Sequence, residues 1–278
     1  MKLLRCVTIA ALCAFFSLSA LAEDCNRAVE IYNSGTSSSD TAEKVRLFKE
    51  ALSLCSEPKL AAKIHNNLAD AYERSGRIDD AKNEYKEAIR NDKKSPTPYF
   101  SLGDIYFKKG DYEYAIDWYE MGLDLQNDEL SEKNLTAARA KVPDYKSKKD
   151  IVAALDPSRA LGVVPKIDFE IEFDYNSDAI RSSSVRQLEA IAQAMTDNLK
   201  DYKFDVVGHT CDVGADDYNM DLSLRRARSV VRYLQEKYHI PSSRFTPQGK
   251  GKTQPIASND TEEGREKNRR VEFINTGM

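Results

Sequence analysis

Residues 68–88, LADAYERSGRIDDAKNEYKEA, are followed 34 residues later by a second copy, LGDIYFKKGDYEYAIDWYEMG, at residues 102–122. Small residues let two helices approach closely, and aromatic side chains fill the gaps between neighbouring helix pairs. The period therefore predicts stacked helical hairpins. Seven positions keep their residue class in the two copies: Leu68 and Leu102, Ala69 and Gly103, Tyr72 and Tyr106, Gly76 and Gly110, Ala81 and Ala115, Tyr85 and Tyr119, and Ala88 and Gly122.

This pattern resembles the tetratricopeptide repeat. Residues 25–55 are then a degenerate first copy, and residues 129–145 are the capping helix that such an array requires. The resemblance implies that a concave groove holds a segment of an unidentified partner protein, with Phe100, Asp104 and Phe107 as candidate groove residues. The remaining aromatic side chains of the third copy are expected in the core: Tyr99, Tyr106, Tyr112, Trp118 and Tyr119.

Length and charge limit the class of protein. A chain of 278 residues is long enough for about two domains. Hydrophobic residues make up 41% of it, which excludes a disordered chain. The formal net charge of −4 lacks the basic excess that holds a phosphate backbone, so nucleic acid is not an expected partner.

Residues 1–22 have the pattern of a signal peptide. Lys2 and Arg5 precede an apolar run over residues 6–16, and residues 20–22 (Ala-Leu-Ala) form a small-x-small cleavage site. The run is shorter than the ~20 residues that cross a bilayer, and no later stretch approaches that length. We expect an exported chain that begins at Glu23 without a membrane span. The acidic residues before Cys25 disfavour a lipid anchor there.

Export leaves Cys25, Cys55 and Cys211 in the mature chain. Apolar spacing predicts two helices within residues 23–55, separated by a linker at residues 34–40. In an antiparallel helix pair the start of the first helix lies beside the end of the second, so a disulfide between Cys25 and Cys55 is predicted. The alternative is two free, buried thiols.

The C-terminal part alternates strands and helices. Residues 167–173 alternate apolar and acidic side chains, which predicts a half-buried strand, and residues 188–199 have helical spacing. Next come a short strand at 204–207 and a polar loop at 208–221. They are followed by a helix with apolar positions from 227 to 238 and by strands near 244–248 and 270–274. The order predicts an α+β sandwich, a mixed sheet covered by helices.

Six ordered motifs over residues 163–274 resemble the OmpA-like peptidoglycan-binding domain. The resemblance implies noncovalent binding of the diaminopimelate of the stem peptide, which would tether the repeats to the cell wall, and a periplasmic location associated with the wall or outer membrane. It assigns Asp174, Thr210, Asn219 and Arg226 to the pocket, with Arg226 as the carboxylate anchor. The motifs are residues 173–177 (FDYNS), 208–210 (GHT), 218–219 (YN), 222–227 (LSLRRA), 249–251 (GKG) and 268–272 (NRRVE).

Charge near Arg226 agrees with an anionic ligand. We interpret Ser223 as an N-cap, which places three arginines (225, 226 and 228) in the first helical turns, where the macrodipole is already positive. A ligand carboxylate would offset this excess of positive charge. The alternative is that the arginines pair with the nearby aspartates, which is the favoured interpretation for Arg225 and Arg228.

Position 211 departs from the family pattern. The family has an aspartate after Gly-His-Thr that receives the ligand's ammonium, whereas this chain has Cys211 and displaces the acid to Asp212. A neutral thiol accepts hydrogen bonds weakly. Wall binding is then weakened, or Asp212 turns inward, or the domain has become a periplasmic scaffold for proteins. A thiol enzyme or metal site formed by His209, Cys211 and Asp212 is disfavoured, because adjacent residues rarely place a base against its nucleophile.

The sequence therefore predicts four segments: a signal peptide (1–22), a tetratricopeptide repeat domain (23–145), a linker (146–162) and an OmpA-like domain (163–278). The protein is expected to be noncatalytic, without a cofactor or metal. The ligand-binding candidates are Asp174, Thr210, Cys211, Asp212, Asn219 and Arg226.

Overall fold

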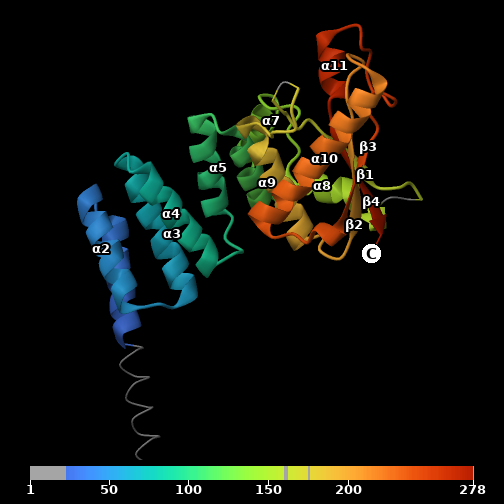
Figure 1. Ribbon diagram of the computed structural model, residues 1–278. Coiled ribbons are helices and arrows are strands. Elements are labelled where there is room, and N and C mark those ends of the chain that lie inside the picture. The colour runs from blue at the N-terminus through green and yellow to red at the C-terminus, as the bar shows by residue number, and fades with distance from the viewer. Residues whose placement is uncertain (1–22, 160–161, 175, 278) are drawn as a thin grey trace, which may run out of the picture. The chain divides into compact units, whose positions relative to one another are not determined.

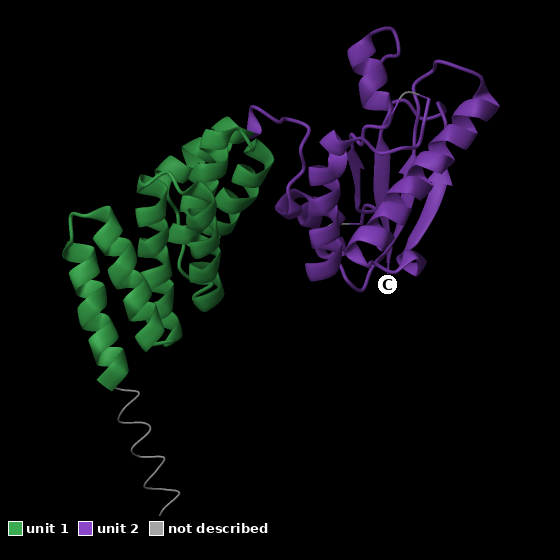
Figure 2. Ribbon diagram, turned by 60° about the vertical axis from the view of Figure 1, so that its left-hand side comes forward, with its two compact units in different colours: residues 1–138 green, residues 139–278 purple. Residues whose placement is uncertain are grey.

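The computed structural model describes residues 23–159, 162–174 and 176–277. The chain divides into two compact units, residues 1–138 and 139–278, which are coloured separately in Figure 2. The predicted signal peptide lies outside the described residues. Among the described helices, none is both long and apolar enough to cross a membrane.

Unit 1 is built from helical hairpins, as predicted. The helices are residues 23–37, α2 (Thr41–Leu54), α3 (Pro58–Arg74), α4 (Ile78–Asn91), α5 (Thr97–Lys109), α6 (Tyr112–Leu123) and α7 (Glu129–Arg139). Contacts join α3 to α4 and α5 to α6 within hairpins, and α2 to α3 and α4 to α5 between them (Figure 1).

The first helix extends into the predicted linker of residues 34–40. The hydroxyl groups of Ser34 and Ser37 donate to the carbonyl oxygens of Glu30 and Asn33, one turn earlier, so these polar residues continue the helix to residue 37. The linker is therefore shorter than predicted, and Asp40 caps α2 by accepting the N–H of Ala42.

Small residues and aromatic rings pack as the repeat pattern predicts. A Cβ atom at Gly103 would lie 2.6 Å from the Tyr119 ring, and one at Gly122 would overlap the ring of Phe100. The hydroxyl of Tyr119 donates to Asp104 at 2.7 Å, and Asp104 also accepts from Asn134.

The predicted groove residues also have contacts inside the unit, and their role in a groove stays a prediction. Phe100 faces Gly122, and Asp104 is bound within the unit. The Phe107 ring packs edge-on against Tyr112. The three side chains thus have internal packing partners.

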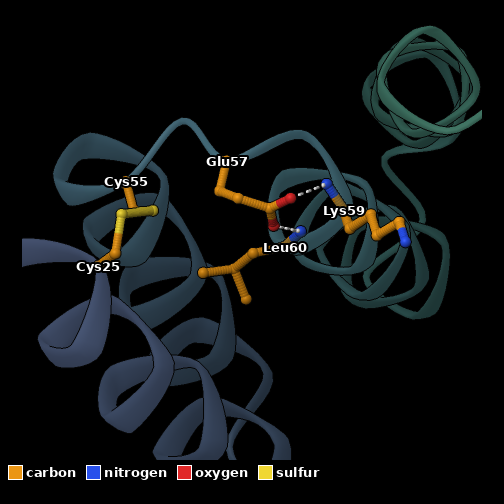
Figure 3. The surroundings of a disulfide bond; sticks show 5 residues. All are labelled: Cys25, Cys55, Glu57, Lys59 and Leu60. Atoms are coloured by element: carbon orange, nitrogen blue, oxygen red, sulfur yellow. Dashed lines mark hydrogen bonds between the residues drawn. A yellow bond between two sulfur atoms is a disulfide. The ribbon is translucent and has the colours of Figure 1, made fainter. Parts of the chain in front are cut away.

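The predicted disulfide between Cys25 and Cys55 is present, with a Cα–Cα distance of 4.8 Å (Figure 3). It joins the start of the first helix to the end of α2. The carboxylate of Glu57 follows directly and caps α3 by accepting the N–H groups of Lys59 and Leu60.

Unit 2 has a four-stranded mixed sheet, which confirms the predicted fold class. The strands are β1 (Lys166–Phe169), β2 (Lys203–Gly208), β3 (Phe245–Gly249) and β4 (Val271–Gly277). Their order is β1-β4-β2-β3; β2 and β3 are parallel, and β4 is antiparallel to β1 and β2. The helices are α8 (Lys148–Leu155), α9 (Val185–Asp197), α10 (Asp216–Tyr238) and α11 (Glu262–Asn268), with single 3₁₀ turns at Pro157–Arg159, Ser182–Ser184 and Ser242–Arg244.

The boundary between the parts differs from the predicted linker at residues 146–162. Ser147 and Asp150 form a capping box that starts α8, and Ile151 and Leu155 are fully buried. Helix α8 contacts α9 and β1, so this segment packs within unit 2.

The first strand is shorter than the predicted residues 167–173. It ends at Phe169, and Phe173 pairs only with Ile180, across a turn in which Asn176 has a positive φ of 55°. The turn directs the chain toward α9 and places Phe173 beside α10 rather than in the sheet.

The N-cap predicted at Ser223 is wrong. Helix α10 begins at Asp216, because Asp216 and Asp217 supply favourable negative charge to its first turn. Ser223 lies inside the helix, fully buried, and its hydroxyl accepts the N–H of Gly251 at 2.9 Å. The arginines at 225, 226 and 228 therefore lie beyond the first two turns, where the positive end of the macrodipole no longer acts on them.

Two glycines of the sequence motifs allow α10 to approach the sheet. A Cβ at Gly208 would overlap the carbonyl oxygen of Ser223, and a Cβ at Gly249 would lie 2.7 Å from the Ser223 hydroxyl. The obstacle at Gly208 is backbone, which cannot rotate away.

We expect Gly208→Ala to lower the free energy of unfolding of unit 2 by about 2 kcal/mol through overpacking. Chemical denaturation of the full chain measures this change. Gly162→Ala is the matched control, since no atom lies within 4 Å of its added Cβ and its φ of 85° alone opposes the substitution. An equal loss in the two variants would contradict the close-approach argument.

Candidate functional site

A pocket of about 360 Å³ lies in unit 2, beside the turn after β1. Both arginines and carboxylates line it. Phe173 adds an aromatic surface. The lining residues are Asp144, Glu170, Ile171, Glu172, Phe173, Arg181, Arg226, Glu266 and Arg269.

Arg226 is held rigidly at this pocket by α10. Its side chain is only 8% exposed, its Nε donates to the carbonyl oxygen of Ser177 at 3.1 Å, and its guanidinium lies 4.9 Å from the centroid of the Phe173 ring. Burial lowers the pKa of Arg226. Among the described residues, no carboxylate lies within 4 Å of its guanidinium. Within the described ranges, its charge is therefore buried without a carboxylate partner.

Arg225, its neighbour, has a different environment. Its Nε donates to Asp221 at 2.8 Å, one turn earlier, and its guanidinium also lies 3.5 Å from Asp178. The interpretation of Arg225 as a paired surface residue is confirmed. Arg228 is exposed on the same helix.

Carboxylates also line the pocket, and one of them, Glu266, lies 3.7 Å from Arg269. Burial and the neighbouring charges of Asp144 and Glu266 raise the pKa of Glu170. Glu172 is instead paired with Arg181 at 3.7 Å and accepts the hydroxyl of Ser183. The acidic group of Asp144, Glu170 and Glu266 therefore favours a positive charge in this pocket.

Cys211 is a buried free thiol close to two arginines. Burial lowers the pKa of Arg269, but hydrogen bonds with Glu262 and Cys211 outweigh it and raise that pKa overall. Asp212 is exposed, and its backbone N–H donates to Asn259 at 3.3 Å. Asp212 thus does not turn into the pocket in this structure, and its predicted ligand role stays a prediction.

The other candidates shape the loops around the site. Asn219 is buried and donates to the carbonyl oxygen of Val213 at 3.0 Å, which fixes the loop before α10. Asp174 is exposed and accepts from Arg181. Thr210 is buried, and its hydroxyl has no hydrogen-bond partner among the described residues. Their predicted ligand contacts stay predictions.

Among the described residues that line the pocket, Arg226 is the one that the sequence predicts as ligand-binding. Arg269 and Phe173 lie in the sequence motifs but are not among the predicted ligand-binding residues. Glu170 occupies an outward position of the predicted strand, and Asp144 and Glu266 come from distant segments with no local signal.

His209 is buried between charged side chains of the sheet. Burial and the positive charge of Arg270 lower its pKa to about 4, although Glu272 opposes this shift, so the ring is neutral near pH 7. Among the described residues, no group of three or more His, Cys, Asp or Glu side chains is arranged to hold a metal ion.

Comparisons with known proteins agree with both units. The OmpA family model matches residues 172–269, and a tetratricopeptide repeat model matches residues 66–129. The chain is 35% identical to outer membrane porin F of Pseudomonas aeruginosa over 116 residues, which are 41% of this chain and 32% of that protein. It is 39% identical to the putative lipoprotein YfiB of Escherichia coli K12 over 107 residues, 38% of this chain and 66% of that protein.

The crystal structure of the peptidoglycan-associated lipoprotein from Burkholderia pseudomallei matches this chain with a TM-score of 0.35 and 23% sequence identity. The match covers 44% of this chain and 97% of that one. The chain spans about a third and about two thirds of the lengths of the two curated relatives. One curated relative is named an outer membrane porin and the other a putative lipoprotein, in agreement with the predicted location at the wall or outer membrane. Each unit thus matches a family over part of its length: residues 66–129 match the tetratricopeptide repeat, and residues 172–269 match the OmpA family.

Proposed function

We propose that unit 2 binds peptidoglycan noncovalently, through the diaminopimelate of the stem peptide, and thereby tethers the repeat unit to the cell wall. The observation that carries this proposal is Arg226. Burying a guanidinium without a carboxylate costs several kcal/mol. An anionic ligand group in the pocket offsets that cost and accepts two parallel hydrogen bonds from the fork.

The mixed lining of the pocket matches the two charges of the ligand. Diaminopimelate carries ammonium and carboxylate groups. The carboxylate binds at Arg226, because Arg269 is already paired with Glu262 at 2.8 Å. An ammonium binds near Asp144 and Glu170, whose mutual repulsion it relieves. In this chain the acidic group takes over the ammonium contact that the family's aspartate makes at position 211.

The proposed role is binding without catalysis, and no cofactor takes part. The full chain should co-sediment with purified sacculi that contain diaminopimelate. Free diaminopimelate should compete, whereas free lysine, which lacks the second carboxylate, should not. Sacculi with lysine in the stem peptide are the matched control.

Cys211 favours a second candidate function, a protein scaffold that has lost wall binding. A chain that stays in the supernatant with both kinds of sacculi supports the scaffold and rejects the wall tether. Equal sedimentation with both kinds rejects recognition of diaminopimelate in particular.

Substitution Cys211→Asp should tighten binding to sacculi by about tenfold, the lower end of the range for a hydrogen bond to a charged group. The new carboxylate would restore an acceptor for the ligand's ammonium at the family's position, and the nearby Arg226 and Arg269 would keep it ionised. Cys211→Ser is the control, because it keeps a small neutral group and should leave affinity unchanged. Unchanged affinity in Cys211→Asp would show that the acid at this position does not matter here.

A further inference from the structure

Strand β1 lies at one edge of the sheet of unit 2. It pairs with β4 on one side, and no other described strand lies beside it. Alternate residues of an antiparallel strand direct their N–H and C=O groups to opposite sides. The N–H of Asn275 donates to the carbonyl oxygen of Pro165, so Pro165 and Ile167 face β4. The N–H and C=O groups of Lys166 and Asp168 therefore point away from the sheet, and among the described residues they have no backbone partner.

The side chains of Lys166 and Asp168 carry opposite charges at this open edge. Lys166 binds Glu272 at 2.7 Å and Asp168 binds Arg270 at 2.8 Å, yet 60% and 40% of the two side chains remain exposed. A lysine commonly protects an edge strand from further pairing. Here the aspartate two residues later lies on the same face and supplies the opposite charge. A strand with the reverse order of charges would therefore be attracted to this edge.

A second copy of β1 has this reverse order when it runs antiparallel to the first. Residues that face outward exchange hydrogen bonds, so Lys166 and Asp168 must lie opposite outward residues of the other copy. With a two-fold axis at Ile167, each Lys166 lies opposite Asp168 of the other copy. An axis at Lys166 or at Asp168 would instead place like charges opposite each other, which is destabilising. Charge thus selects the register with the axis at Ile167.

A pocket of about 500 Å³ lies beside the same edge, between α8 and β1. Helix α8 contacts β1, but its alanines leave space next to the half-buried side chain of Ile167. Residues directly opposite each other in a sheet lie on the same face, so Ile167 of the second copy would enter this space. Val163 and Val164, just before β1, are 72% and 59% exposed and extend the apolar part of the edge. The apolar lining residues of the pocket are Pro143, Tyr145, Ala153, Ala154 and Ile167.

We propose that unit 2 associates with a second copy of this chain through β1, with the two-fold axis at Ile167, so that two sheets become one. The pairing gives partners to the backbone groups that β1 leaves open, and the second isoleucine fills the pocket beside α8. The joined edge is short, so we expect a Kd of about 10 μM. The association does not use the wall pocket, and Arg226→Ala should associate as the wild type does.

Sedimentation equilibrium of the full chain from about 1 to 100 μM tests this association. The apparent mass should rise from that of one chain toward that of two. Ile167→Lys places like charges against each other at the axis and should weaken association at least tenfold. Thr246→Lys is the matched control, because Thr246 is exposed on β3, the other edge strand, and association should stay unchanged. A wild-type chain that stays monomeric, or equal association of Ile167→Lys and wild type, overturns the proposal.

A disulfide crosslink tests the register without relying on the folding of Ile167→Lys. In a Cys211→Ser background, Ile167→Cys should form a disulfide between copies under copper-catalysed air oxidation. Opposite residues at the axis have Cα atoms about 4.5 Å apart, a distance that a disulfide spans. Lys166→Cys and Asp168→Cys lie two residues from their own counterparts, beyond that reach, and should not crosslink. Nonreducing electrophoresis measures the yield. Crosslinking of either of these two instead of Ile167→Cys, or of none of the three, overturns the proposal.

Discussion

Substitution Arg226→Ala should lower the affinity of the full chain for diaminopimelate-containing sacculi by about a hundredfold, which is the loss expected for a charged, two-pronged hydrogen bond. The guanidinium is fixed by Ser177 and Phe173 and meets no carboxylate among the described residues, so its free N–H groups are available to a ligand. Co-sedimentation over a range of protein concentrations measures the change.

The same substitution should leave unit 2 folded. It removes a hydrogen bond and a ring contact worth about 1 kcal/mol each, and it also removes the cost of burying a charge, which acts in the opposite direction. Denaturation curves of both proteins should therefore remain cooperative, with similar midpoints.

Arg225→Ala is the matched control for Arg226→Ala. It deletes the adjacent arginine, which pairs with Asp221 and lies on the exposed side of α10, and affinity should stay within about twofold. Arg226→Lys should bind between wild type and Arg226→Ala, because lysine keeps the charge without the planar fork. Wild-type affinity in Arg226→Ala would exclude this pocket as the wall site.

The repeat unit could be predicted well because its signal is local and periodic. The two small residues Gly103 and Gly122 each face an aromatic ring of the paired helix, Tyr119 and Phe100, so the repeat pattern indicates which helix faces meet. The hydroxyl bond from Tyr85 to Asp70 recurs 34 residues later as the bond from Tyr119 to Asp104. The period does not identify the residues of a groove, because residues that pack inside the unit and residues that face a groove alternate along the same helix.

The pocket was only partly predictable because its wall comes from separate segments. The motif identifies Arg226, but the predicted helix start beside it is wrong. Ser223 has the residue type of an N-cap, whereas its hydroxyl lies inside α10 and accepts the N–H of Gly251. The acidic wall joins Asp144, Glu170 and Glu266, and only the folded sheet brings these together. No sequence spacing records such a contact.

Removing the disulfide with Cys25→Ala and Cys55→Ala should lower the free energy of unfolding of the first hairpin by roughly 3–4 kcal/mol in the loop-entropy model. Alanine is chosen because Cys55 is buried and serine would leave a polar group there. Hydrogen exchange of residues 23–37 measures the effect, and these amides should exchange several hundredfold faster through local opening, at about 1.4 kcal/mol per tenfold change.

The loss should stay local, because each hairpin of a repeat array is held mainly by its nearest neighbour. The first helix is at the end of the array, and Ala28 packs there in one core with Phe48 and Ile64. Exchange in α5 and α6 should therefore be unchanged, and Cys211→Ser, which removes the remaining free thiol, should alter neither region. If the first helix kept its protection without the disulfide, packing on Phe48 alone would be enough to hold it, and the crosslink would contribute little to the stability of the array.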